Sequence, residues 1–587
     1  MWLSWLLAIT LNLSVAMPLV AVNNGGAALD ALAERYWQHE LQTDPQLRAE
    51  VGLPIETIRP TTYANAQADA AFAQGMLDDL GRIDAPGLDH DRWLTLRTLQ
   101  YLAGKEATSA KYYWLAQQAT PYMGGLRLGF LAQTFATFKF ANDADATRYV
   151  GLLNQFAAYV RSLGDLLRGQ HAHGVVLPVA EIDAAQAVYE GYAQPTQAAA
   201  LVPSEERLQA LAPAQRASLR AGAQNAAQFQ VGPAFQGVAD YLKGDYRQGA
   251  PTPVGLWQYP GGDAYYRYLV VAETTVTTTP EKLHAQGLQS VATTNAAIDD
   301  IRREVGFAGD LTAFKHFLAT DSQFFLPTPE AFGERLEVYM QRAATAAPRY
   351  FAHMPTAPFG VAPLPKELAG SQTFGYYSPP TADQPKGEYL YNAWHPERTS
   401  ALGAGALICH ELIPGHHFQI ALQQENTALP NVRRYDSSET GFVEGWGEYA
   451  SQLCWDMGVY STPYDKAGRL MQDLMVSVRL VVDTGMNAMH WSREGASAYM
   501  RDNLTLSDAQ IASETLRYST DMPAQALAYK TGELTLLQIR EHAQKRLGKA
   551  FDIRTFHAWV LDSGSMTLDT LRAHVDYEIA QQEPHGG

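Results

Sequence analysis

The sequence predicts a large, mainly α-helical protein. Its 587 residues are 47% hydrophobic and 18% charged, an ordinary globular composition that allows a large core. Apolar residues recur at helical spacing, with few β-branched runs, through residues 27–50, 65–170, 180–230, 281–346 and 465–503. Because no fixed-period repeat or long low-complexity linker divides these stretches, we expect residues 22–587 to form a single helical domain.

Prolines and glycines indicate where several helices begin and end. A helix is expected over residues 27–50, with Asp44-Pro45 ending it, because proline cannot continue a helix. Residues 250–262 combine several prolines and glycines with aromatic side chains, which indicates a loop. A new helix is expected at Pro280-Glu281, since proline is favoured in the first helical turn.

Extended structure is expected only at residues 372–395. Two alternating runs, 372–378 and 388–394, are separated by prolines and a glycine, which predicts a small β-hairpin. A peptide could add to the edge of such a hairpin, with Tyr391 and Asn392 as candidate substrate contacts. The alternative is that the hairpin only covers the core.

The N-terminus resembles a secretory signal peptide. Residues 1–21 form an interrupted apolar run with small-residue cleavage options after Ala16 or Ala21, although no basic residue precedes the run. The run is too short for a convincing membrane span. We therefore expect an exported, periplasmic protein without a stable membrane span in the mature chain; the alternative is a buried N-terminal helix.

The charge of the chain excludes some partners. The net charge is −17, and Lys and Arg do not gather into runs. Nucleic acids and anionic membrane surfaces are therefore not expected as partners. The acidity says nothing about the substrate.

One stretch concentrates residues with catalytic chemistry. His410, Glu411, His416 and His417 lie within eight residues of an otherwise apolar run. Neutral imidazoles can hold a zinc ion, and a carboxylate beside the first imidazole can take a proton from water. The alternative is a kinked core helix whose histidines are satisfied by hydrogen bonds.

The spacing of these histidines requires a broken helix. In a straight helix, six or seven residues would separate His410 from His416 or His417 by roughly 9 to 10.5 Å. Two ligands about 2.0–2.1 Å from one zinc cannot be that far apart. Pro414 disfavours a continuous helix and Gly415 tolerates positive φ, so we expect a break that returns His410 beside one histidine of the pair.

A third ligand is expected from the stretch 439–450. Glu444 and Glu448 lie one helical turn apart in an aromatic segment. One can bind the metal while the other orients a ligating histidine. We favour Glu444 as the ligand.

The two cysteines of the chain, Cys409 and Cys454, are expected to be buried and free. Thiolates bind zinc, but adjacent helical residues point about 100° apart, so Cys409 should face away from a metal bound by His410. A core of this size does not need a disulfide.

The motif H-E-x-x-P-G-H-H followed by E-G-W resembles the bacterial domain-of-unknown-function family 885, which is related to zinc peptidases of the angiotensin-converting-enzyme and oligopeptidase type. The resemblance covers nearly all of the mature chain. It implies a two-lobed peptidase fold around a deep cleft, with the small hairpin beside the metal helix. It also implies zinc ligation by His410, one histidine of the pair and Glu444, with Glu411 as general base. The chain departs from the family at Asn487, where histidine is usual, so that histidine's role is not carried over.

Further residues are candidates for substrate binding. Arg479 could pair with Asp483, four residues on, or could bind a substrate carboxylate in a bidentate clamp. Tyr518 and Tyr529 are candidate donors to a tetrahedral oxyanion. His557 is expected to be structural.

These observations predict a zinc-dependent hydrolase that cleaves peptide bonds, as an oligopeptidase, dipeptidase or carboxypeptidase, with one Zn²⁺ per chain. Two alternatives remain: a catalytically silent periplasmic peptide- or metal-binding protein, and a zinc hydrolase of a non-peptide amide. Glu411 favours an enzyme, because a site that only binds metal needs no carboxylate beside the first ligand.

Overall fold

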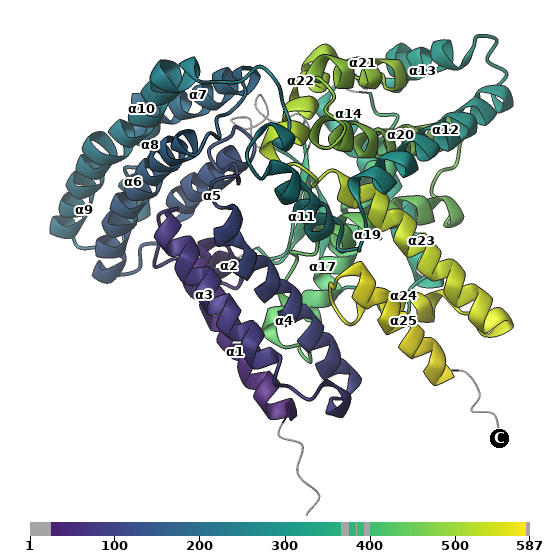
Figure 1. Ribbon diagram of the computed structural model, residues 1–587, viewed down its shortest axis with the longest axis horizontal. Helices are drawn as coiled ribbons and strands as arrows, with labels where there is room; N and C mark the ends of the chain where they lie inside the picture. Colours follow the sequence, from purple (N-terminus) through teal and green to yellow (C-terminus); the bar gives the residue numbers. More distant parts are fainter. Residues whose placement is uncertain (1–24, 365–374, 383, 393–399, 583–587) are drawn as a thin grey trace, which may run out of the picture.

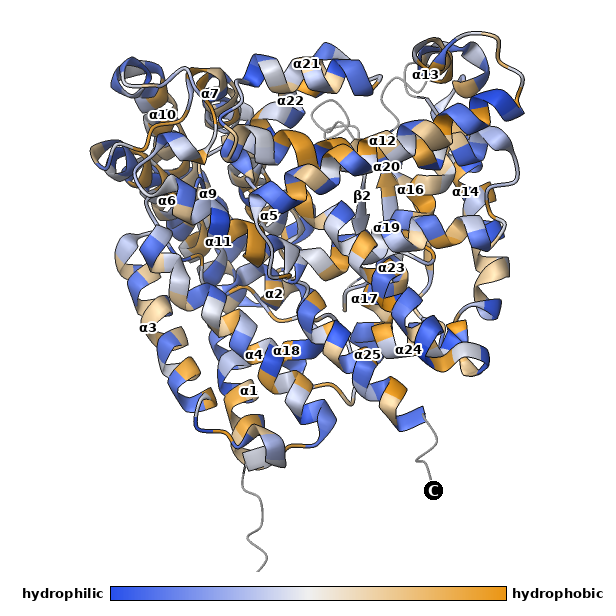
Figure 2. Ribbon diagram, turned by 45° about the vertical axis from the view of Figure 1, so that its right-hand side comes forward, coloured by the Kyte–Doolittle hydropathy of each residue, from blue (hydrophilic) through white to orange (hydrophobic). Residues whose placement is uncertain are grey.

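Helices dominate the computed structural model, as the apolar periodicity predicts. The structure describes residues 25–364, 375–382, 384–392 and 400–582. The expected signal peptide at residues 1–21 lies outside these residues. Hydrophilic and hydrophobic residues alternate along the outer helices in Figure 2, as expected of helices that bury one face.

The first helices form a bundle at the bottom of Figure 1. The expected first helix is confirmed, and Asp44 and Pro45 divide it, because the Asp44 side chain accepts a hydrogen bond from the backbone N–H of Gln46 and starts a new short helix. The elements are α1 (Gly25–Thr43), α2 (Pro45–Glu50), α3 (Tyr63–Leu80) and α4 (His90–Ser109).

A second group of helices has an apolar core of its own. Its buried side chains include Leu152, Phe156 and Phe235. These helices form the lobe on the left of Figure 1: α5 (Met123–Thr137), α6 (Asp143–Ala172), α7 (Val179–Ala193), α8 (Pro195–Ala200), α9 (Pro213–Ala226) and α10 (Gly232–Tyr241).

The remaining helices build the larger lobe. The expected helix start at Pro280 is confirmed, since Thr279 caps the helix by accepting from the N–H of Lys282. The helices are α11 (Gly262–Thr274), α12 (Pro280–Glu304), α13 (Leu311–Thr320), α14 (Pro329–Ala346), α16 (Ala404–Glu411), α17 (His416–Glu425), α18 (Asn431–Arg434), α19 (Thr440–Asp456), α20 (Pro463–Asn487), α21 (Arg493–Asn503), α22 (Asp508–Leu516), α23 (Leu527–Leu547), α24 (Ile553–Leu561) and α25 (Leu568–Gln582).

A small sheet precedes the histidine-rich helices. The expected hairpin is confirmed where it is described: β2 (Tyr376–Ser378) pairs antiparallel with β3 (Gly387–Tyr391). A further strand, β1 (Phe359–Pro363), pairs parallel with β3, giving the order β1-β3-β2. We did not predict β1, because a short run ending in proline carries little strand signal by itself. Residues 372–374 and 393–394 of the expected hairpin lie outside the described residues.

The expectation of free cysteines is wrong. Cys409 on α16 and Cys454 on α19 form a disulfide between two fully buried side chains. The two helices also share a hydrogen bond from the Ser451 hydroxyl to the carbonyl of Ala406 (3.1 Å). The sequence could not reveal this pairing, because it depends on how two helices 45 residues apart cross.

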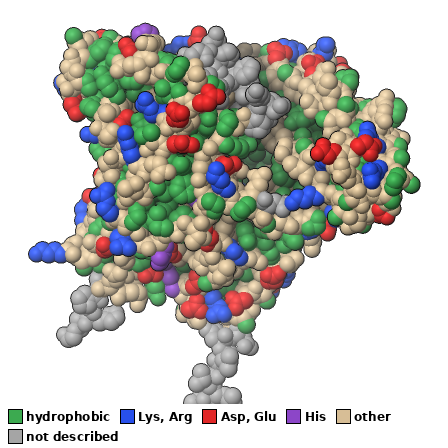
Figure 3. Space-filling model, turned by 180° about the vertical axis from the view of Figure 1, so that it is seen from behind, with side chains coloured by type: hydrophobic (Ala, Val, Ile, Leu, Met, Phe, Trp, Pro, Cys, Tyr) green, Lys and Arg blue, Asp and Glu red, His purple; other side chains and the backbone are tan. Residues whose placement is uncertain are grey.

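The expectation about membrane spans can be compared with the helices of the described residues. Among these residues, no helix combines the length and apolar character needed to cross a bilayer. On the face seen in Figure 3, acidic and basic side chains are interspersed.

We predict that replacing both cysteines by alanine lowers thermal stability. By loop-closure entropy, a cross-link over a separation of 45 residues stabilises the fold by up to about 4 kcal/mol, and typical measured values are about 2–4 kcal/mol. The variant Cys409→Ala/Cys454→Ala should melt several degrees below wild type when both are measured metal-free by scanning calorimetry. Thiol titration of unfolded, unreduced wild-type protein is the control, and two free thiols there would contradict the disulfide.

Candidate metal centre

The helix carrying the His-Glu pair breaks as the spacing predicts. Helix α16 ends at Glu411 and α17 begins at His416, with a cis Ile413-Pro414 peptide between them. Trp446 on α19 holds this break, since its indole N–H donates to the Pro414 carbonyl (2.9 Å).

The reason for a glycine at position 415 differs from the one we expected. Its φ is −78°, so positive φ is not the reason for glycine. A Cβ atom at this position would lie 1.8 Å from the carbonyl oxygen of His410. Glycine is therefore needed because the chain turns back closely on the end of α16.

Three side chains converge beside the break. Nε2 of His410 lies 3.6 Å and Nε2 of His416 lies 3.5 Å from Oε2 of Glu444 on α19, and the three ligand atoms lie within 4.8 Å of one another. Ligands bound about 2.0–2.2 Å from one zinc at tetrahedral angles are about 3.3–3.6 Å apart. The arrangement therefore fits the ligand set of one zinc ion with a fourth position open.

His417 lies outside this group. Its Nδ1 is 2.9 Å from the Tyr377 hydroxyl and its Nε2 is 3.2 Å from the Ala357 carbonyl. Both ring nitrogens are thus occupied by the sheet region, and burial lowers the pKa of His417 to about 4. Of the two alternatives that the sequence left open, the structure brings His416 to the centre.

Two other groups of histidine and carboxylate side chains occur among the described residues: His90 with His574 and Glu578, and His39 with Asp69 and Glu106. In the first group the facing imidazole nitrogens are 2.8 Å apart, which is a hydrogen-bond distance and short for two ligands of one zinc. In the second, the aspartate already pairs with Arg59 at 3.0 Å. The centre at His410 fits a metal better than either.

Glu448 supports the centre from behind. Its Oε1 lies 3.3 Å from Nδ1 of His410 and accepts a hydrogen bond from Gln472 (2.9 Å), and its Oε2 lies 3.5 Å from Arg469. A carboxylate on the second nitrogen of a ligating histidine fixes the tautomer and the orientation of the ring. Glu444 thus lies beside both imidazoles and Glu448 lies behind His410, which is the arrangement expected of a ligand and an orienting residue.

A chain of buried charges continues from Glu448 into the core. Arg469 is fully buried and pairs with Glu533 at 2.7 Å, and Lys530 bridges Glu533 (2.8 Å) to Asp473 (2.6 Å). Glu448, Asp473 and Glu533 surround Arg469 and Lys530, and Glu444 adds a fourth carboxylate on the side of the imidazoles. If all six groups are ionised, the excess is two negative charges, which favours a bound dication.

The electrostatics at His410 agree with this charge balance. Burial alone would lower the pKa of His410, but the carboxylates of Glu444 and Glu448 outweigh it and raise that pKa to about 10. Burial alone would raise the pKa of Glu444, but the imidazoles of His410 and His416 outweigh it and lower that pKa. The centre thus attracts a cation, whether a proton or a metal ion.

The glycine between Trp446 and Glu448 makes room for the first imidazole. A Cβ atom on Gly447 would lie 2.7 Å from Cε1 of His410, closer than real Cβ contacts. The E-G-W-G-E stretch therefore combines a candidate ligand, a tryptophan that bonds the break, space for the His410 ring and a carboxylate behind that ring.

Glu411 lies between the centre and the sheet. Burial raises the pKa of its carboxyl, while the neighbouring imidazoles of His410 and His416 lower it. The charge of Glu411 in turn adds to burial in raising the pKa of Tyr377 and Tyr389 on β2 and β3. Its carboxylate is thus close to the ligands without being one of them.

Tyr529 and Tyr518, the two tyrosine candidates, differ in position. The Tyr529 ring stacks on His410, with centroids 6.2 Å apart. Tyr518 is fully buried, and its hydroxyl donates to Glu514 and accepts from Nε of Arg479 (2.8 Å). Tyr529 is therefore the tyrosine beside the centre, whereas the hydroxyl of Tyr518 is already committed.

The expected pair of Arg479 and Asp483 does not form. Arg479 pairs with Glu514 at 3.2 Å. Asp483 instead accepts from the Tyr266 hydroxyl (2.7 Å) and from the N–H of Ala524 (3.0 Å). The partners of Arg479 and Asp483 therefore come from segments distant in the sequence. Buried polar groups pair with the partners that tertiary packing brings to them.

Three further residues have structural positions. Asn487 is buried, donates to the Tyr518 carbonyl (2.9 Å) and accepts from the N–H of Leu256 (3.0 Å). His557 is buried between the Tyr449 hydroxyl (2.8 Å) and the Tyr350 carbonyl (2.9 Å), a structural role as expected. Asn392 directly follows β3, and its substrate role stays a prediction.

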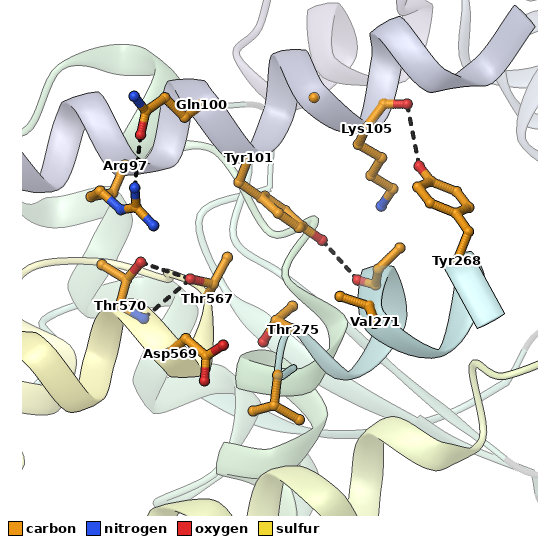
Figure 4. A pocket seen from close by; sticks show the side chains of 13 residues that line it. Arg97, Gln100, Tyr101, Lys105, Tyr268, Val271, Thr275, Thr567, Asp569 and Thr570 are labelled. Carbon is orange, nitrogen blue, oxygen red and sulfur yellow. Dashed lines mark hydrogen bonds between the residues drawn. The ribbon is translucent and has the colours of Figure 1, made fainter. Parts of the chain in front are cut away.

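A pocket of about 360 Å³ lies elsewhere, between α4, α11 and the start of α25 (Figure 4). The Tyr101 hydroxyl donates to the Ala272 carbonyl across it (3.0 Å). Its carboxylate, Asp569, accepts from the Thr277 hydroxyl (3.1 Å). None of its lining residues belongs to the centre at His410, so pocket and centre are separate features.

Fold and site together define a mainly helical protein with a two-histidine, one-glutamate centre on crossing helices. A comparison with protein families matches residues 45–575 to the family described as bacterial protein of unknown function (DUF885). The chain therefore belongs to this family. None of the curated proteins matches it.

Solved structures share the fold. A proposed lipoprotein from Colwellia psychrerythraea is 23% identical, with a TM-score of 0.86 over 96% of this chain and 100% of that one. A proposed lipoprotein of unknown function from Shewanella oneidensis is 15% identical, with a TM-score of 0.69 over 93% of this chain and 99% of that one. At these identities the likeness is one of fold alone.

We predict different metal affinities for two glutamate variants. Glu444→Gln removes a ligand and should abolish stoichiometric zinc binding. Glu448→Gln removes the negative charge behind His410 but no ligand, and should weaken zinc binding about 10- to 100-fold. Competition with a chromophoric chelator measures both, with circular dichroism as the folding control. The reverse order would make Glu448 the ligand.

We also predict that substitutions of His416 and His417 have different effects on zinc binding. His416→Gln should lose stoichiometric zinc, while the matched variant His417→Gln should keep it, because His417 bonds Tyr377 and Ala357. Elemental analysis of both purified proteins provides the measurement. Zinc loss in the folded His417 variant alone would contradict this assignment.

Proposed function

We propose that this protein is a zinc-dependent peptidase. The observation that carries the proposal is the spacing of His410, His416 and Glu444, with Glu411 adjacent to the first ligand and Glu448 behind it. Two histidines and a glutamate with an open position form a ligand set used by catalytic zinc. Peptides as substrates rest on the resemblance of the motif to zinc peptidases, which is an analogy.

In this proposal the metal, Glu411 and Glu448 have different roles. Zinc, when bound, supplies a Lewis acid that activates water and polarises a carbonyl. Glu411 takes the proton of the attacking water on its carboxylate and gives it to the leaving amine. Glu448 keeps Nε2 of His410 directed at the ligand position by holding Nδ1.

Tyr529 is the proposed donor to the developing oxyanion. It stacks on His410, and its hydroxyl has one weak contact, from the Gln525 amide at 3.4 Å. A hydroxyl that stays uncommitted before the reaction can donate where negative charge develops. Tyr518 is not assigned this role, because its hydroxyl already serves Arg479 and Glu514.

We further propose that the protein is exported. The disulfide between Cys409 and Cys454 supports an oxidising compartment such as the periplasm. The apolar N-terminal run supports the same location. The structural relatives described as proposed lipoproteins point the same way.

The first test is Glu411→Gln. This variant should keep one zinc per chain, because Glu411 is not a ligand, while the turnover of peptides falls by about 10²–10⁴-fold. Zinc is measured by elemental analysis, and turnover by mass spectrometry of a mixed peptide library. Tyr529→Phe is the companion, expected to lower kcat with a smaller effect on zinc.

The outcomes distinguish the alternatives. Loss of wild-type peptide cleavage with chelator, restored by zinc, supports the proposal. Zinc without peptide cleavage would favour hydrolysis of a non-peptide amide or a silent binding protein, which assays on other amides separate. Unchanged turnover in the Glu411 variant would remove Glu411 as the base.

A further inference from the structure

We propose that Arg517, together with Arg479, forms a subsite that binds a carboxylate of the substrate, the C-terminal carboxylate of a peptide. This inference rests on the proposed function for the nature of the substrate. The arginines themselves are argued from contacts among described residues. They lie on α20 and on the helical turn η10 (Arg517–Asp521) that follows α22.

The two guanidinium groups share one carboxylate. Arg479 lies 3.2 Å from Oε2 of Glu514, and Arg517 lies 3.7 Å from Oε1 of the same side chain. Glu514 also accepts from the Tyr518 hydroxyl. One carboxylate cannot neutralise two cations, so the pair keeps a positive charge that a bound anion would balance.

Arg517 has donors to offer that anion. Its one described hydrogen bond runs to Oε1 of Gln525 (2.8 Å), and its Nε is buried without a hydrogen-bond partner among the described residues. A guanidinium group has five N–H donors arranged for bidentate carboxylate binding. Arg517 is thus less committed than Arg479, which also donates to Tyr518.

Aromatic rings hold the two guanidinium planes. Arg479 lies over the Tyr529 ring at 4.9 Å, and Arg517 lies over the Tyr122 ring at 4.9 Å. Stacking fixes the plane of a guanidinium group while leaving its N–H edge for a ligand. Tyr122 precedes α5, so the smaller lobe contributes one wall of the subsite.

The other carboxyls near Arg517 have partners of their own. Asp483 is bound by Tyr266 and the N–H of Ala524. Asp521 accepts from the N–H of Tyr122 (3.3 Å). Neither lies within ion-pair distance of Arg517 among the described contacts, so both act on Arg517 only at longer range.

The subsite is within reach of the metal centre and of solvent. The centroid of the Tyr529 ring is 6.2 Å from that of His410 and 4.9 Å from Cζ of Arg479, so Arg479 lies within about 11 Å of His410, a span of about three extended residues. The side chains of Arg479 and Arg517 keep 11% and 12% of their surface exposed, so both lie at the edge of the packed interior. This geometry points to cleavage near the C-terminus of a peptide.

The test compares peptides with a free C-terminus and the same peptides with a C-terminal amide. Zinc-loaded Glu411→Gln protein, which should bind without cleaving, is titrated with both forms by calorimetry. We expect the free acid to bind at least about tenfold more tightly, since an amide removes a charged hydrogen-bond acceptor. Equal affinities for the free acid and the amide would overturn the proposal, because both arginines are intact in this protein.

Arginine variants assign the effect. In the Glu411→Gln background, Arg517→Gln should abolish the preference for the free acid, while Arg501→Gln, the same charge change at an exposed arginine paired with Asp508, should keep it. A preference unchanged by Arg517→Gln in folded protein would also overturn the proposal. If Arg517→Gln does not fold, the acid and amide comparison still decides.

Failure of the inference and failure of the proposed function look different. Wild-type protein that cleaves acid and amide peptides equally well would refute the subsite and keep the peptidase. Protein that binds the free acid selectively but cleaves no peptide would keep the subsite and refute the peptidase.

Discussion

Helix α19 fixes the geometry of the centre by three contacts with the broken helix α16–α17. Glu444 faces the two imidazoles, Trp446 donates to the carbonyl of Pro414, and Cys454 is bonded to Cys409. Because these residues lie on one rigid helix, each contact limits the movement of the others. A break in α16–α17 without this support would leave the second imidazole free to turn away from the first.

The buried charges behind the centre are costly, which suggests that they serve orientation. Arg469 has no exposed surface, and Glu448 and Glu533 have almost none. Buried ion pairs contribute little net stability compared with apolar packing, although removing one partner is strongly destabilising. A set of alternating charges does, however, hold Glu448 in one position, and Glu448 holds the ring of His410. The network therefore links the core of α20 and α23 to the orientation of a single imidazole.

The region around the arginines joins the two lobes. Tyr122 comes from the smaller lobe, Arg479 from α20 and Arg517 from η10, and Tyr529 on α23 connects them to His410. A substrate lying here would contact elements from both lobes. If the proposed function holds, a change in how the lobes pack would alter substrate binding more than metal binding, since the candidate ligands all come from α16, α17 and α19.

The sequence by itself determined the helical class, the start of α12 at Pro280, the β2–β3 hairpin and the break between His410 and His416, because these depend on local periodicity, caps and turn chemistry. The choice between His416 and His417 was left open, since adjacent residues differ only in the direction they face. Only the tertiary structure decided this choice, the pairing of Cys409 with Cys454, and the partners of Arg479 and Asp483. These three features depend on how helices distant in the sequence pack against one another, and local sequence patterns do not determine that packing.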